Sequence, residues 1–223
     1  MIFLKRTKPI VVRLYTDSPN VHRLFPPKLA SQLKPNFFAD KNDITRTCPG
    51  ARKMFSSGFG IPLWCDLDMH THINDKNEVD GEFTFSDKKN YLTLRTEKTS
   101  VIPGSKICME MHCPWYAQCD EDINFVATEN MWTNPERPVE FLSGVADFKY
   151  QYTLNMFFYM DKKSKHTQLN SGDVPIIWKQ LSERKLVIEY FYDPDRYRYL
   201  HECGRDSAFR DFRYSRVRNL LSK

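Results

Sequence analysis

The sequence predicts a mainly β fold, in the form of an antiparallel sandwich or a distorted barrel. Three observations support this class. Short runs of β-branched and aromatic residues recur along the chain, turn residues separate these runs, and no strand–helix–strand alternation indicates a parallel sheet. We also expect a short N-terminal helix and a helical C-terminal tail.

The composition fits an ordinary globular protein. The chain has 223 residues, of which 41% are hydrophobic and 14% aromatic, and its net charge of +5 is too small to indicate nucleic-acid binding by the whole chain. The sequence contains no apolar run of transmembrane length, and its first residues do not form a signal peptide, so we expect no membrane span. We therefore expect reduced thiols at Cys48, Cys65, Cys108, Cys113, Cys119 and Cys203.

Residues 1–45 are predicted to form a strand followed by a proline-rich wrapping segment. The strand is Ile10–Tyr15, which is β-branched and aromatic. Residues 17–40 contain several prolines, which indicate an extended connector, with one helical turn at Lys28–Leu33. A short helix is expected at 43–58, and Gly58 is expected to end it.

Residues 46–192 are predicted to form the β-rich core domain, and its clearest strand is Ile61–Ile73. Apolar and polar residues alternate there, with Leu67 and Met69 on one face and acidic and histidine residues on the other. Strict alternation is typical of a half-buried strand in an antiparallel sheet.

A hairpin is expected next, between strands at 82–86 and 91–95. Further strands are predicted where apolar and aromatic runs lie between turn residues. They are Lys106–Met111, Asn124–Ala127, Val139–Leu142, Tyr150–Tyr159, Val174–Trp178 and Leu186–Phe191.

Residues 193–223 are predicted to form a basic helical tail. Asp195 is expected to cap a helix from Arg196 to Cys203, Gly204 to end it, and a second helix to run to Leu221. The tail suits an acidic partner or a nucleic-acid backbone, although a solvated helix face is the alternative. Its candidate contact residues are Arg205, Arg210, Arg213, Arg216 and Arg218.

The polar face of the strand at 61–73 offers weak candidates for a metal site. Imidazole and carboxylate groups suit zinc or iron, but same-face neighbours lie about 6.5–7 Å apart along a strand, so only neighbouring pairs chelate easily. We interpret this row as a solvated strand face and expect no metal and no cofactor. The candidates are Asp66, Asp68, His70 and His72.

A second cluster of potential ligands surrounds Cys113. Cys108, His112 and Cys119 lie near it in sequence, but the paired C-x2-C spacing that identifies zinc sites is absent. We therefore interpret these cysteines as structural thiols.

Two segments resemble the trimeric dUTP pyrophosphatases and the related dCTP deaminases. Phe141–Tyr150 corresponds to the hairpin of that family, and Leu169–Ile177 to its following turn and strand. The resemblance implies a homotrimer in which Asp147 activates water and Tyr150 packs on the deoxyribose. The family's phosphate loop should precede the hairpin, but Thr128–Arg137 lacks its Arg-Ser-Gly sequence.

The chain as a whole resembles an uncharacterised protein family of tailed, especially marine, bacteriophages. The segments that carry this resemblance include Cys48-Pro49-Gly50, Gly60–Asp66 and Cys113-Pro114-Trp115. It implies a structural or assembly protein that contacts other virion proteins, forms a homo-oligomer and is made in the host cytoplasm before it enters the virion. The alternative is a nucleotide-binding or nucleotide-hydrolysing protein, and we expect the non-enzymatic role.

Overall fold

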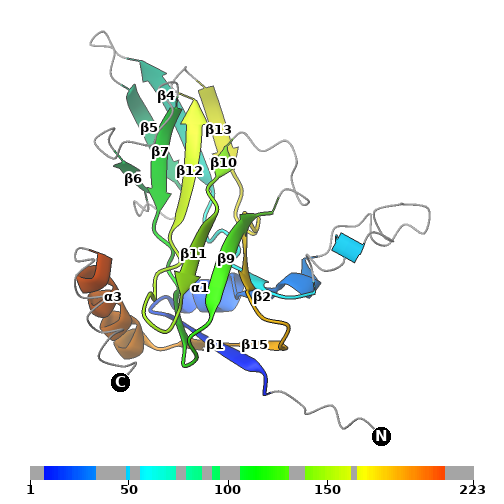
Figure 1. Ribbon diagram of the computed structural model, residues 1–223. Helices are drawn as coiled ribbons and strands as arrows, with labels where there is room; N and C mark the ends of the chain where they lie inside the picture. The colour runs from blue at the N-terminus through cyan, green and yellow to red at the C-terminus, as the bar shows by residue number, and fades with distance from the viewer. Residues whose placement is uncertain are drawn as a thin grey trace, which may run out of the picture.

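The computed structural model (Figure 1) contains four β-sheets and few helices, which confirms the prediction of a mainly β chain. None of the sheets that its described residues form is a closed barrel. The structure describes residues 8–33, 49–50, 56–73, 79–86, 92–95, 106–130, 139–161 and 165–208. Most of the helix predicted at 43–58 lies outside these ranges.

The first sheet has its N-terminal strand at the centre. This strand, β1 (Ile10–Thr16), pairs in parallel with β15 (Leu186–Tyr192) and antiparallel with β8 (Tyr116–Cys119). The prediction of a purely antiparallel fold was therefore wrong for one pair. Local sequence does not reveal this pairing, because its two strands lie at opposite ends of the chain.

The other three sheets are antiparallel throughout the described residues. One has the order β10 (Glu140–Phe141), β12 (Met156–Asp161), β7 (Lys106–Met111) and β6 (Leu92–Arg95). The next has the order β11 (Gly144–Asp147), β9 (Asn124–Glu129), β14 (Ile176–Gln180), β3 (Phe59–Gly60) and β2 (Lys28–Leu29). The last has the order β13 (Lys165–Leu169), β4 (Leu67–Ile73) and β5 (Val79–Phe85).

The hairpin predicted across residues 82–95 was wrong. Both of its strands exist, but β5 pairs with β4 and β6 pairs with β7, so they belong to different sheets. Sequence proximity favoured a hairpin, whereas the observed partners are set by the longer-range pairing of each strand.

A helix replaces part of the predicted extended connector. This helix, α1 (Pro19–Leu24), begins after Ser18, whose hydroxyl accepts a hydrogen bond from the Val21 N–H at 3.3 Å. Serine at the N-cap and proline in the first turn are a helix-start signal that outweighs the extended tendency of a proline-rich stretch. The helical turn predicted nearby is confirmed as the 3₁₀ helix η1 (Ala30–Gln32).

The C-terminal helix, α3 (Pro194–Ala208), begins and ends elsewhere than predicted. The cap is Asp193 rather than Asp195, since the Asp193 carboxylate accepts a hydrogen bond from the Arg196 N–H at 2.9 Å. The helix also continues through Gly204, because glycine weakens a helix without ending it when the flanking residues remain helical. The second predicted helix lies mostly outside the described residues.

One hydrophobic core joins all four sheets. A single cluster of buried residues contains Ile10 from β1, Phe125 from β9, Met69 from β4 and Phe158 from β12. The predicted N-terminal unit at 1–45 thus shares its core with the unit at 46–192 through β1. Among the described residues, no helix is long and apolar enough to span a bilayer.

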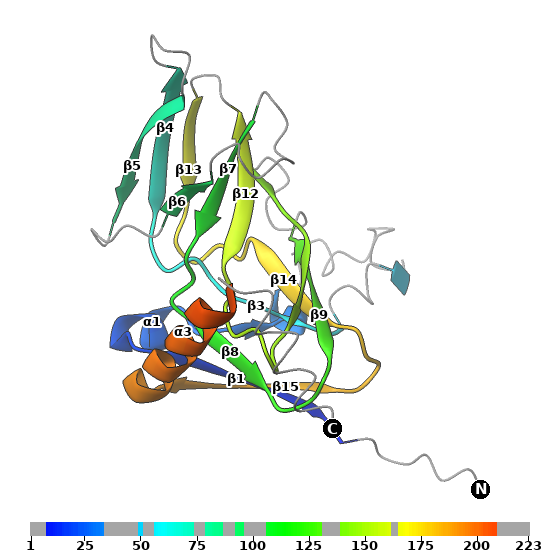
Figure 2. The same ribbon diagram turned by 60° about the vertical axis from the view of Figure 1, so that its left-hand side comes forward.

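The sheets are arranged along an elongated molecule. The β13-β4-β5 sheet lies toward one end, while β15-β1-β8, α1 and α3 lie toward the other (Figures 1 and 2).

Replacement of Gly60 by alanine should destabilise this core. A Cβ atom there would collide with a Val174 methyl group and lie 3.0 Å from Leu33 Cδ1 and 3.1 Å from the Ile176 carbonyl oxygen. Overpacking of this kind costs about 1–3 kcal/mol. Gly144→Ala is the matched control, because a Cβ at Gly144 meets nothing within 4 Å. Urea unfolding that shows equal stability for both variants would contradict the packing described here.

Candidate metal centre

The strand β4 presents a buried face and an exposed face. Leu67 and Met69 are 1% and 0% exposed, whereas Asp68 is half-buried and His70 is exposed. The predicted alternation is therefore confirmed for this part of the strand. Burial of the apolar side chains fixes which residues face solvent, because successive side chains of a strand point to opposite faces.

The neighbouring strand β13 follows the same pattern. Thr167 and Leu169 are buried, while His166 and Gln168 are exposed. In the antiparallel register, His166 lies directly opposite His70, and Gln168 lies opposite Asp68. The two histidines and the aspartate thus share one face of the sheet.

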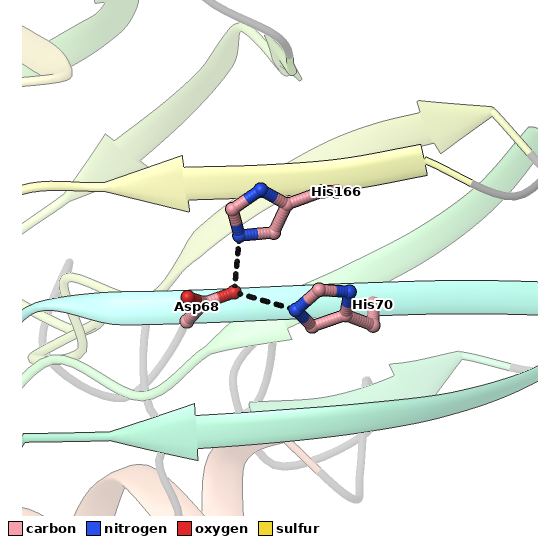
Figure 3. A group of neighbouring side chains, drawn as sticks. All are labelled: Asp68, His70 and His166. Atoms are coloured by element: carbon pink, nitrogen blue, oxygen red, sulfur yellow. Dashed lines mark hydrogen bonds and ion pairs between the residues drawn. The ribbon is translucent and has the colours of Figure 1, made fainter.

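The three side chains converge on one carboxylate oxygen (Figure 3). Asp68 Oδ1 lies 2.7 Å from His166 Nε2 and 3.3 Å from His70 Nε2. The two imidazole rings are stacked, with centroids 4.4 Å apart and an interplanar angle of 16°. One ligand atom from each residue can therefore face the same small volume.

These side chains are accessible from solvent. The exposed fractions are 42% for Asp68, 59% for His70 and 54% for His166. An ion can therefore reach the group without any opening of the fold. We call this group the Asp68–His70–His166 cluster.

The cluster has the chemistry and approximate size of a transition-metal site. Its ligand atoms all lie within 4.8 Å of one another. At metal–ligand distances near 2.1 Å, two ligands of a tetrahedral zinc ion are about 3.4 Å apart. The present spacing of the three donors is thus close to what such an ion needs, and three protein ligands would leave one coordination position open.

Asp66 belongs to a different interaction. Its carboxylate accepts a hydrogen bond of 2.7 Å from the Ser171 N–H, which holds the pKa of Asp66 below its usual range. This contact attaches the start of β4 to the turn after β13. The side chain of His72, the fourth sequence candidate, lies outside the described part of the chain.

The histidine from β13 was missed by the sequence analysis. His166 stands in the short run Lys165–Leu169, which was not predicted as a strand. Its signal is the alternation of His166 and Gln168 with Thr167 and Leu169, but this run is brief and largely polar. Pairing with β4, which no local pattern reveals, then places His166 beside Asp68.

Asp147 is the last residue of β11, and Tyr150 lies in the turn that follows it. Asp147 is 4% exposed; its carboxylate accepts a hydrogen bond from the Lys149 N–H at 3.0 Å, and its carbonyl accepts one from the Tyr150 N–H, also at 3.0 Å. Tyr150 is 6% exposed. These contacts give both residues a structural role in the turn.

A cavity whose lining includes Ala146 and Gln151, on either side of this turn, is not lined by Asp147 or Tyr150. Its volume is about 410 Å³, and its lining also includes Glu110, Asn155 and Trp178. A second cavity, of about 810 Å³, lies beside Gln180 and Arg184. Neither cavity is lined by the Asp68–His70–His166 cluster.

The described cysteines are free thiols and largely buried. Cys65, Cys108, Cys113 and Cys119 are buried, and Cys203 is partly exposed. Burial raises the pKa of the Cys113 thiol to about 12, so the free thiol stays protonated near neutral pH. The interpretation of Cys113 as a structural residue agrees with this environment.

The basic tail is described only at its start. Arg205 lies in α3, and its side chain is outside the described part of the structure. The other candidate contact residues lie outside the described residues altogether. They are Arg210, Arg213, Arg216 and Arg218.

The assignment of the site depends on its geometry. No family model, curated protein or solved structure matches the chain. The convergence of Asp68, His70 and His166 is therefore the observation from which a function is argued.

Proposed function

We propose that this protein binds a divalent transition-metal ion through Asp68, His70 and His166. The observation that carries the proposal is the convergence of two imidazole nitrogens and one carboxylate oxygen within 4.8 Å. The two strands that supply these ligands are held in register by their buried faces, so the donors are preorganised.

The donor set selects the class of metal. Imidazole nitrogen with a single carboxylate suits Zn²⁺, Ni²⁺, Cu²⁺ or Fe²⁺, whereas Mg²⁺ and Ca²⁺ favour sites built of oxygen ligands. With two nitrogens and one carboxylate, the cluster offers too few oxygens for the latter ions. We take Zn²⁺ as the ion that best represents the class.

The position of the cluster favours metal binding at the surface over catalysis in an enclosed active site. It lies on an exposed sheet face, and neither of the two cavities described above adjoins it. An ion held there would be open to solvent, and water or a side chain of another protein would complete its coordination. This arrangement suits a surface ion that stabilises the sheet or a contact with a partner.

Zinc titration of protein without a histidine tag tests the proposal. By isothermal titration calorimetry we expect one Zn²⁺ ion per chain and no comparable binding of Mg²⁺. His166→Gln and Asp68→Asn should each weaken Zn²⁺ binding at least tenfold, because the first removes an imidazole ligand and the second replaces a carboxylate by a neutral amide.

Gln168→Ala is the matched control for that titration. Gln168 lies on the same exposed face, directly opposite Asp68, but supplies none of the three ligand atoms. The Gln168→Ala variant should bind Zn²⁺ with the affinity of the wild type. Equal Zn²⁺ affinity in all four proteins would refute a site at this cluster.

A second proposed function is the sequence-based one, assembly within a bacteriophage particle. One structural observation favours it: the sheet edge formed by β15 exposes three consecutive aromatic residues, which are Tyr190, Phe191 and Tyr192. Aromatic side chains are enriched in protein interfaces. A trimeric dUTP pyrophosphatase-like fold and nucleotide binding stay predictions that depend on the segments 141–150 and 169–177.

Mass spectrometry of purified phage particles tests the assembly role. The protein should be recovered from particles after stringent washing, in a fixed ratio to the major structural proteins. Its presence in infected cells together with its absence from particles would contradict this role and leave the metal site unaffected.

A further inference from the structure

The last strand of the β15-β1-β8 sheet is an edge. β15 pairs with β1 on one side, and among the described residues no strand pairs with its other side. Figure 2 shows β15 along the lower margin of the molecule. The strand runs for seven residues, Leu186–Tyr192, so its outer side is a long row of backbone groups.

The hydrogen bonds at both ends of β15 show which backbone groups face outward. The Ile10 N–H donates to the Lys185 carbonyl, and the Asp193 N–H donates to the Thr16 carbonyl. Residues 185 and 193 therefore face β1. Because a strand alternates the direction of its backbone groups, those of Ile188, Tyr190 and Tyr192 face away from β1.

This edge lacks the usual protection against strand pairing. Natural edges carry lysine, proline, bulges or uncompensated charges that block a second strand. From Leu186 to Tyr192 there is no lysine or proline, and the only charged residue, Glu189, is paired with Arg13 at 3.3 Å. Glu189 is therefore the one charged side chain that an incoming strand would meet between Leu186 and Tyr192.

Two of the three aromatic side chains of this edge already contact other rings of the fold. The Tyr190 ring lies edge-on to Trp115 with centroids 6.2 Å apart, and the Phe191 ring stacks on Tyr15 at 5.5 Å. All three aromatics nevertheless remain at least 40% exposed. A partner strand would meet a preorganised surface, which reduces the entropic cost of association.

We propose that β15 pairs antiparallel with β15 of a second copy of this chain, around a two-fold axis at Tyr190. The occupant is a second copy because an antiparallel pair of identical strands is self-complementary. In this register Tyr190 faces Tyr190 of the second copy, and Ile188 faces Tyr192 of the second copy. Aromatic–aromatic and aromatic–β-branched pairs of this kind stabilise sheets.

Charge selects this register over its neighbour. A two-fold axis at Glu189 would also pair outward backbone groups, but it would place two carboxylates directly opposite each other. Like charges in that position destabilise a sheet. With the axis at Tyr190, Glu189 faces Phe191 of the second copy instead. The contact lies at the opposite end of the molecule from the Asp68–His70–His166 cluster, so it requires no metal ion (Figures 1 and 2).

Sedimentation velocity over a concentration series tests the pairing. The wild-type chain should show a monomer–dimer equilibrium. Tyr192→Pro removes an outward N–H and should raise the dimer dissociation constant at least tenfold, whereas Tyr192→Ala keeps that N–H and should have a smaller effect. A wild type that stays monomeric throughout, or two variants that dimerise alike, would overturn the proposal.

Amide hydrogen exchange provides a test that needs no variant. With rising protein concentration, the outward amides of Ile188, Tyr190 and Tyr192 should become protected, while the inward amides of Val187, Glu189 and Phe191 should be protected at every concentration. If dimers form as the protein concentration rises but the outward amides exchange at the same rate throughout, the contact lies elsewhere and this pairing is rejected.

Discussion

The burial of alternate residues along β4 is the constraint on which the candidate site depends. Leu67 and Met69 face the core almost completely buried, and this forces Asp68 and His70 to the opposite face. Each buried apolar side chain contributes about 1.5–3 kcal/mol. If the pairing register of β4 shifted by one residue, Leu67 and Met69 would become exposed, and the Asp68 carboxylate and the His70 imidazole would become buried. The register of the strand is therefore strongly fixed.

Core packing also links the site to the rest of the fold. β13 buries Thr167 and Leu169 against the same core, and its pairing with β4 sets His166 opposite His70. At the other end of the molecule, β1 is inserted between β15 and β8, and Arg184 hydrogen-bonds Glu121 and the Lys8 carbonyl beside it. Both exposed features, the metal cluster and the β15 edge, thus arise from strands that core packing holds in place.

The sequence predicted which side chains of a strand face solvent, but it did not predict which strands pair with each other. Alternation identified the polar face that carries Asp68 and His70, because one-sided burial leaves a local pattern. It did not identify His166, the parallel pairing of β1 with β15 or the separation of β5 from β6, because each depends on contacts between distant residues. The start of α1 had a local signal, Ser18 followed by Pro19, which the many nearby prolines obscured.

A crystal structure grown with Zn²⁺, with anomalous scattering measured at the zinc absorption edge, tests the central claim most directly. We predict an anomalous peak about 2.0–2.2 Å from Asp68 Oδ1, His70 Nε2 and His166 Nε2. Ordered side chains at these three residues without a peak between them, or a zinc ion bound by other ligands of the chain, would contradict it.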